Sequence, residues 1–442
     1  MQKKALLALL LALTLILSGC ALVTVDEAKD LARTIIDVNG ETVNKAAFTN
    51  AVNYTLNQYE YLNQFYAAQY GVSSAYNTDR ATVIQEVADN YISTMVSRQK
   101  ARELGMYEFT DEEKEHVQEH AKEDYDSYVQ QVISAYFVNS DLEGDALTAA
   151  AEAYMQEHGL STYDDFVQDA ENEVALEKLH TDIVKDVQVT DEEVASSLAE
   201  QAEAAKTQYE SSPEAYGVSV NNGSTVYYAP AGYRMVKQIL IGFTEEDSAA
   251  ITEADNAVTA AQTALTDAEA ALENAAEDAD RDALAAAVTT AQAGLADAQQ
   301  KADDAKAAAL ATAKVKADEV YALATAEGAD FDALISEYNE DTGMPENGYA
   351  VREGYSRFVE PFVQAAMALE KVGDVSEPAE STYGYHIIQY AAEVQEGTVD
   401  TEEVRESIRS SLQSTKESQK ASETLDAWIS AADVKTYLDR MN

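Results

Sequence analysis

Two alanine-rich stretches in the middle of the chain carry apolar residues at an unbroken spacing of three and four. The first runs from Ile251 to Ala275 and the second from Leu284 to Ala309, with the polar residues 277–280 between them. This spacing places the apolar residues along one seam of a helix. The sequence therefore predicts an antiparallel coiled-coil hairpin over residues 246–312, with arms of roughly 35–40 Å at about 1.5 Å per residue. The alternative is a disordered alanine-rich linker.

The segments on either side of this hairpin have the patterns of a small α+β domain. Residues 233–243 (YRMVKQILIGF) alternate as a strand does, and the second arm runs on into a helix over 314–326. Further along, apolar residues at helical spacing over 358–369 end at Gly373, and the strand 385–390 follows. The hairpin is therefore predicted to be an insertion that leaves its host domain closed.

The run from Phe358 to Tyr390 closely resembles the C-terminal half of a parvulin-type peptidyl-prolyl isomerase domain, and residues 233–243 resemble its first strand. The resemblance implies a parvulin-like domain over residues 233–395. It also implies that the domain rotates X–Pro bonds without covalent chemistry and without a cofactor. Such a site needs an apolar seat for the proline ring and polar groups that favour the twisted amide.

Matching the family motif residue by residue gives a candidate site. The expected proline seat consists of Phe358 and Phe362, with Ala350 as a further substrate-binding residue. The expected catalytic residues are Asp341, Ser381, His386 and Gln238. An alternative for His386 is a histidine that is hydrogen-bonded inside the sheet, and the two roles are compatible.

Two departures from the family pattern bear on activity. Gln238 replaces the first family histidine, and a glutamine cannot titrate. The glycine-rich family loop is replaced by residues 347–351 (NGYAV), which loses glycine freedom beside the pocket. The sequence therefore leaves two functions open: a peptidyl-prolyl isomerase of weakened activity, and a catalytically degenerate holdase.

The N-terminus has the pattern of a targeting segment. Lys3 and Lys4 precede an apolar run over 5–17, which is too short for a typical membrane span. The run ends in Leu-Ser-Gly-Cys at 17–20, which resembles the lipobox of bacterial lipoproteins and implies cleavage before Cys20 and lipidation there; a plain secretory peptide is the alternative. Several acyl chains on one residue anchor a protein stably.

The segment between the targeting peptide and the isomerase pattern is helical in period. A tether is expected over 21–37, an N-terminal helical domain over 38–210 and a linker, irregular with a hairpin, over 211–232. The sequence "V-N-G-x-x-V" at 38–43 resembles the opening of PrsA- and SurA-type foldases. Thr110 and Thr190 each precede a Glu by three residues, which is the signature of a helix-capping box.

Tyrosines crowd the first long helix of this segment. They stand at positions Tyr54, Tyr59, Tyr61, Tyr66, Tyr70 and Tyr76. An aromatic stripe usually belongs to a core, and the functional alternative is a surface that binds unfolded chains.

One metal-binding pattern also occurs in this segment. Residues 116–120 fit H-x-x-E-H, a zinc-hydrolase pattern, but they lie within a charge-rich helix without an apolar scaffold. We therefore expect no metal site there.

The resemblance places the chain among the PrsA/SurA-type extracytoplasmic foldases. It implies an α+β fold in which a mostly helical chaperone domain, built from both ends of the chain and including 396–442, holds the isomerase domain as an insertion. The expected partners are unfolded or newly exported proteins and their proline-containing segments, with membrane contact through the lipid only. The net charge of −50 argues against nucleic acid as a partner. Homodimerisation or partner docking through the hairpin is a further alternative.

Overall fold

The computed structural model describes residues 27–72, 74–277 and 279–441, and these residues divide into two compact units. The first unit comprises residues up to Gln188 together with those from Gln413 onward, and the second runs from Val189 to Leu412. Cys20 and its lipobox lie outside the described residues. Within the described part of the chain, no helix combines the length and the apolar character needed to cross a bilayer. The fold is mostly helical α+β, as expected.

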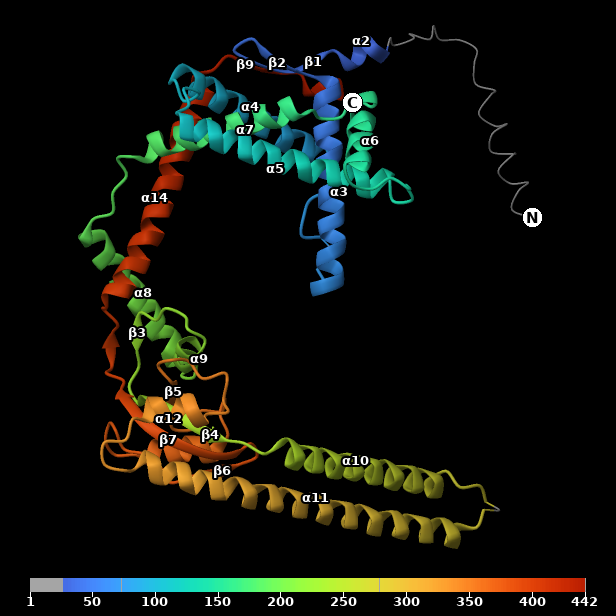
Figure 1. Cartoon of the computed structure of the whole chain (residues 1–442), viewed down its shortest axis with the longest axis vertical. Coiled ribbons are helices and arrows are strands. Elements are labelled where there is room, and N and C mark those ends of the chain that lie inside the picture. Colours follow the sequence, from blue (N-terminus) through green and yellow to red (C-terminus); the bar gives the residue numbers. More distant parts are fainter. Residues whose placement is uncertain (1–26, 73, 278, 442) are drawn as a thin grey trace. The chain divides into compact units, whose positions relative to one another are not determined.

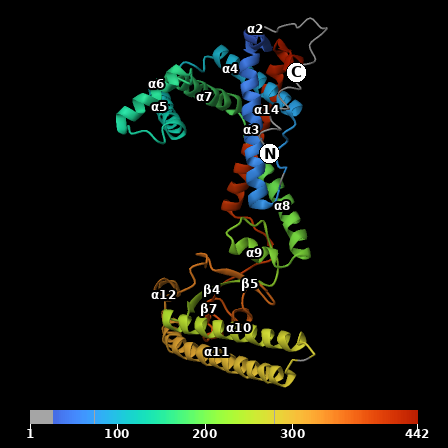
Figure 2. The same ribbon diagram turned by 90° about the vertical axis from the view of Figure 1, so that its right-hand side faces the viewer.

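The first unit packs long helices beside a small antiparallel sheet. Its elements are α2 (Glu27–Leu31), β1 (Thr34–Val38), β2 (Glu41–Asn44), α3 (Lys45–Tyr70), α4 (Arg80–Glu103), α5 (Asp111–Tyr136), α6 (Gly144–Glu157), α7 (Tyr163–Val184), β9 (Val434–Thr436) and the 3-10 helix η1 (Leu438–Met441). The strands are ordered β2-β1-β9, so the two ends of the described chain share one sheet. Figure 2 shows α5, α6 and α7 grouped together (teal and green).

The predicted capping boxes are confirmed. The Thr110 hydroxyl accepts from the Glu113 amide at the start of α5, and the Glu113 carboxylate accepts from the Thr110 amide. Thr190 and Glu193 make the same reciprocal pair at the start of α8 (Asp191–Ser211). Each box satisfies amide donors that the first turn of a helix leaves without an intrahelical partner.

The second unit is built around a four-stranded sheet. Its elements after α8 are α9 (Ala215–Asn221), β3 (Tyr228–Ala229), β4 (Tyr233–Ile241), α10 (Glu245–Glu273), α11 (Arg281–Ala324), α12 (Phe331–Tyr338), β5 (Tyr349–Arg352), α13 (Glu360–Ala368), β6 (Ala379–Ser381), β7 (Gly384–Glu393), β8 (Gly397–Thr398) and α14 (Glu402–Ala431), which ends in the first unit. The sheet order is β5-β4-β7-β6, with antiparallel pairing throughout. The central strands β4 and β7 are the longest.

The two faces of this sheet are covered by different helices. Ile239, Ile241 and Ile387 are fully buried on one face against the C-terminal part of α11. Val236 and Ile388 are buried on the opposite face, beside α13 and Phe362. Because neighbouring strand residues point to opposite faces, this alternation fixes which side chains meet.

Helices α10 and α11 lie side by side as a hairpin between β4 and α12 (Figures 1 and 2). Thr244 caps α10 directly after β4, and Asp280 caps α11. The C-terminal part of α11 packs under the sheet, so one helix serves both as an arm of the hairpin and as a helix of the α+β domain. A helical insertion at this place is what the sequence predicted.

The expectation of an irregular linker over 211–232 is wrong for residues 215–221, which form helix α9. The Tyr233 hydroxyl donates to the Pro213 carbonyl and accepts from the Gly217 amide, and this hydroxyl thereby ties the short helix to β4. A side chain at Gly217 would meet the Tyr355 ring at 2.9 Å. Tertiary packing therefore orders a segment that has only a weak helix signal of its own.

Candidate functional site

Two polar side chains of the candidate site, Gln238 and His386, come from the two central strands, and Asp341 and Ser381 come from the loop after α12 and from β6. Gln238 of β4 stands directly opposite Ile388 of β7, and His386 lies two residues away on the same face. Both are buried, with exposures of 4%. The strand register alone therefore brings the glutamine and the histidine together.

These residues form one continuous hydrogen-bonded chain. The Gln238 amide nitrogen donates to Asp341 Oδ2 over 2.6 Å, and its carbonyl oxygen lies 2.7 Å from His386 Nδ1. His386 Nε2 lies 2.7 Å from Ser381 Oγ. All four residues predicted as catalytic thus belong to a single network.

The network fixes the position of its protons. A carboxylate only accepts, so Asp341 orients the amide with its nitrogen toward the carboxylate and its oxygen toward His386. Nδ1 of His386 must then carry the proton that bonds to this oxygen. Nε2 of the neutral ring consequently accepts, and the Ser381 hydroxyl donates to it.

Burial lowers the pKa of His386 to about 4, while the charge of Asp341 opposes this shift in part. The ring is therefore neutral at pH 7. It acts as a fixed donor and acceptor rather than as a cation.

Asp341 is held by donors on both oxygens. Its Oδ2 accepts from Gln238 and from the Tyr349 hydroxyl at 2.9 Å, and its Oδ1 accepts from the Gly343 amide at 3.0 Å. Burial, followed by the hydrogen bond and charge of Asp341, raises the pKa of Tyr349 far above its usual value. Tyr349 is thus a protonated donor to Asp341.

Sequence reasoning missed Tyr349. It stands in the segment that departs from the family pattern, and the signal that could have found it is the glycine before it. Gly348 has a φ of +79°, and a side chain there would lie 2.2 Å from the Val236 carbonyl. This close approach sets Tyr349 against β4, and its ring packs against Phe358 and against Phe362 of α13.

An aromatic cluster adjoins the polar network. The ring of Phe362 packs edge-on against His386 with 5.5 Å between centroids, and Phe358 lies 5.0 Å from Phe362. Tyr349 lies 4.8 Å from Phe358. Phe362 is 1% exposed, whereas Phe358 is only partly buried and lines a cavity of about 710 Å³ with Tyr355, Val363 and Met367.

Ala350 does not belong to this site. It is fully buried on the opposite face of β5, in the cluster that contains Tyr216 and Tyr233. Tyr349 and Val351 point toward α13, so strand alternation turns Ala350 toward α9. Its assignment to substrate binding is therefore corrected.

Residues 295–392 match the model of the Rotamase family, described as a PPIC-type PPIase domain. The second unit contains a PPIC-type PPIase domain. Foldase protein PrsA 2 of Listeria innocua is 40% identical over 77 residues, which is 17% of this chain and 26% of the relative. Foldase protein PrsA 4 of Bacillus cereus is 48% identical over 63 residues, which is 14% of this chain and 22% of the relative. The chain thus matches only about a quarter of the length of these PrsA relatives.

Solved structures of this kind are similar to the whole chain only weakly. The PrsA structure from Bacillus cereus covers 92% of this chain and 94% of its own at 16% identity, with a TM-score of 0.17. One chain from a study of two SurA-like chaperones of Campylobacter jejuni covers 91% of this chain and 98% of its own at 9% identity, with a TM-score of 0.25. At such scores neither likeness bears on the arrangement of the whole chain.

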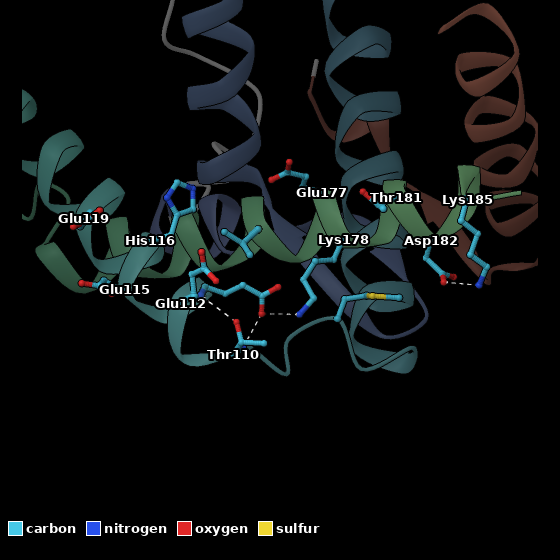
Figure 3. Close-up of a pocket in the computed structure, with 13 residues that line it drawn as sticks. Thr110, Glu112, Glu115, His116, Glu119, Glu177, Lys178, Thr181, Asp182 and Lys185 are labelled. Carbon is cyan, nitrogen blue, oxygen red and sulfur yellow. Dashed lines mark hydrogen bonds and ion pairs between the residues drawn. The ribbon is translucent and has the colours of Figure 1, made fainter. Parts of the chain in front are cut away.

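A second cavity, of about 890 Å³, lies in the first unit between α5 and α7 (Figure 3). Carboxylates dominate its lining, and it includes His116 and Glu119 of the H-x-x-E-H pattern. Lys178 bonds to Glu113 at 3.1 Å and Lys185 to Asp182 at 2.8 Å, so two of the carboxylates have cationic partners. Among the residues described, no group of three or more His, Cys, Asp or Glu side chains is placed to hold a metal ion.

The tyrosines of α3 fall into two groups. Tyr54, Tyr61 and Tyr70 are 66%, 65% and 64% exposed, so the core interpretation is wrong for these three. Tyr59 and Tyr66 are partly buried, and Tyr59 stacks at 5.1 Å on Tyr76, which follows the helix and is also partly buried. Phe65, 48% exposed, lies on the same side of α3 as Tyr54 and Tyr61, and we call these three residues the α3 aromatic face.

Proposed function

We propose that this protein is a foldase that acts outside the cytoplasm on newly exported, unfolded chains and isomerises their X–Pro bonds. The observation that carries the proposal is the continuous network from Ser381 through His386 and Gln238 to Asp341, placed directly beside the Phe358–Phe362 cluster. The match of residues 295–392 to the PPIC-type PPIase model supports the same assignment. The partners are proline-containing segments of the client.

Catalysis requires only that the site bind the twisted amide more tightly than the planar amide. Rotation about the peptide bond has a barrier of about 18–20 kcal/mol, because resonance must be broken. Phe358, partly open to solvent, seats the proline ring, and Phe362 supports it from below. The Ser381 hydroxyl is held in place by His386 and by the Tyr383 amide. Its dipole is therefore already oriented beside the rotating bond and need not reorient during the reaction.

Gln238 fits this role although it cannot titrate. One amide group both donates and accepts, so it satisfies Asp341 and His386 simultaneously. Since burial keeps His386 neutral, the network needs no second titrating ring to hold its geometry. This argument favours retained turnover over a fully degenerate site.

The test is catalysed isomerisation of an X–Pro peptide by the chain lacking residues 1–20, with Phe358→Ala as the variant. We expect turnover above background in the parent and a loss of about tenfold or more in the variant, since truncation removes most of the apolar seat. Leu323→Ala, at a 47% exposed site of α11, is the control for general surface change. Absence of turnover in the parent would refute the isomerase.

A second candidate function, holding unfolded clients without isomerisation, is favoured by the α3 aromatic face. Exposed apolar groups gathered on one helix mark interaction surfaces. Suppression of client aggregation by a chain that shows no X–Pro turnover would establish this function in place of the first.

We also propose that Cys20 carries the lipid anchor, because it is the only cysteine and ends the lipobox pattern. Mass spectrometry of protein isolated from membranes should show a lipid on residue 20. The variant Cys20→Ser should appear in the soluble fraction. Equal membrane association of the variant would refute the anchor.

A further inference from the structure

The hairpin helices and the PPIase domain enclose a groove of about 660 Å³. Ile251 and Asp255 of α10 and Lys306 and Leu310 of α11 form one wall. The other wall belongs to the PPIase domain and consists of Phe243, Val359, Glu360, Pro361, Glu380, Ser381 and Thr382. Apolar side chains thus face the groove from both sides.

The hairpin wall is held at a fixed distance from the sheet. Helix α10 follows β4 after only Gly242, Phe243 and Thr244, and Thr244 caps it. Helix α11 continues from Leu310 into the buried Ala313 and Ala317, which pack under the sheet. Between the arms, Lys306 and Asp255 pair at 3.1 Å, so the part of the hairpin that lines the groove is tied to the domain and to itself.

The groove is continuous with the site that contains His386. Ser381 lines the groove and bonds to His386 Nε2. Pro361 and Val359 line it at the start of α13, the helix that carries Phe362. A chain whose proline lay at Phe358 and Phe362 would therefore reach the groove within a few residues.

The shape and charge of the groove select its occupant. Glu380 and Ser381 belong to β6, which is an edge strand because it pairs only with β7 in the sheet. Edge strands present free backbone groups to which an extended peptide can bond. Lys306 is matched by Asp255. Within the described residues, Glu360 and Glu380 accept hydrogen bonds from the neutral groups of Gln364 and Tyr385 and form no ion pair, so the lining keeps an excess of negative charge.

We propose that the helical hairpin forms the outer wall of a subsite that binds an extended, apolar segment of the client, with Lys or Arg flanking it, next to the target proline. The insertion then acts as a specificity element for the PPIase domain. This inference rests on the proposed isomerase function for its location, but it can be tested through binding alone.

The experiment compares two peptides with the same central X–Pro bond, using the chain without residues 1–20. One peptide is short and flanked by alanine, and the other carries Leu, Ile and Lys residues on both sides of the bond. We expect the kcat/KM of the parent to be about tenfold higher for the long peptide, mainly through KM, which is the order expected for partial burial of one or two apolar side chains.

Two variants should lower the ratio of kcat/KM for the long peptide to kcat/KM for the short peptide to about one. Ile251→Asp places a further carboxylate in the groove from the hairpin side, and Thr382→Trp fills it from the exposed turn after β6. The second variant keeps the test valid if the first disturbs helix packing. Val315→Asp, at an exposed site of α11 outside the groove, makes the same change in charge and should keep the parent ratio. An unchanged ratio in both groove variants would overturn the proposal.

Fluorescence anisotropy of the labelled long peptide separates this proposal from the isomerase function. If the parent lacks turnover but binds the long peptide, and both groove variants weaken that binding about tenfold relative to Val315→Asp, the isomerase is refuted and the subsite stands. Equal binding by all variants refutes the subsite. If sedimentation shows that the parent is a dimer that Ile251→Asp converts to a monomer, the groove is a contact between copies and the client subsite is overturned.

Discussion

The protein has two aromatic clusters of similar composition in opposite surroundings. Tyr349, Phe358 and Phe362 lie against a buried polar network, and Phe362 is 1% exposed. On α3, Tyr54 and Tyr61 are about two-thirds exposed. A rigid cluster beside fixed dipoles suits the positioning of a single proline ring, whereas an open aromatic face suits contacts with many sequences. The comparison predicts that substitutions affect stability and turnover at the first cluster, and only client binding at the second.

The largest effect is expected for Phe362→Ala. Removing a fully buried phenylalanine leaves a cavity and should lower the free energy of unfolding of the second unit by about 3–5 kcal/mol. Urea unfolding monitored by amide hydrogen exchange in β4 and β7 measures this loss of stability. The α3 variant Phe65→Ala removes the same side chain from a 48% exposed site and should cost far less. Equal losses at the two sites would show that the clusters do not differ.

The next effect concerns the polar network rather than the rings. Gln238→Leu keeps the approximate volume but leaves the Nδ1–H of His386 unpaired and removes a donor from Asp341. An orphaned buried polar group costs about 1–3 kcal/mol, so stability and turnover should both fall. The control Gln364→Leu changes an exposed glutamine on α13 and should cost less than about 0.5 kcal/mol. A neutral Gln238→Leu would mean that the network does not support the site.

A smaller effect is expected from pH. The pKa of His386 is lowered from 6.5 to about 4 in the folded state, so the unfolded chain binds more protons between these values. Stability should therefore fall as pH drops from 6.5 toward 4, by at most about 1.4 kcal/mol per pH unit from this residue. The many carboxylates also titrate there, so the measured quantity is the difference in slope from His386→Asn. Identical slopes would place the histidine in a solvated environment.

The sequence predicted some strands and site residues correctly and others wrongly. Alternation in residues 233–243 and the 385–390 strand predicted the two central strands, and the family motif selected Gln238, Asp341, Ser381 and His386, which the structure joins in one network. The same reasoning misplaced Ala350, because the parity of β5 depends on its register with β4 and no local pattern encodes that register. The family match begins at residue 295, so β4 lies outside it and the inserted helix α10 separates this strand from the matched region.

The exposure of the α3 tyrosines was likewise beyond sequence reasoning. Phe48 and Val52 are the only described residues of α3 that are buried, and both lie in its N-terminal third, where β1 and α4 cover the helix. Periodicity shows that a stripe exists, but whether a neighbour covers it depends on where the other helices end. Aromatic composition alone therefore favoured burial for residues that the fold leaves open.

The smallest effect on stability is expected at this open face. The triple variant Tyr54→Ser, Tyr61→Ser and Phe65→Ser should change the free energy of unfolding by about 0.5 kcal/mol or less per site, because these rings have little packing to lose. X–Pro turnover of a short peptide should be unchanged, while suppression of aggregation of an unfolded client should weaken. The matched control replaces Tyr70, Tyr136 and Tyr383, which are exposed to a similar degree outside the α3 aromatic face. If the control weakens client protection equally, general surface aromaticity is responsible. If only the triple variant does so, holding and isomerisation belong to separate surfaces of one chain.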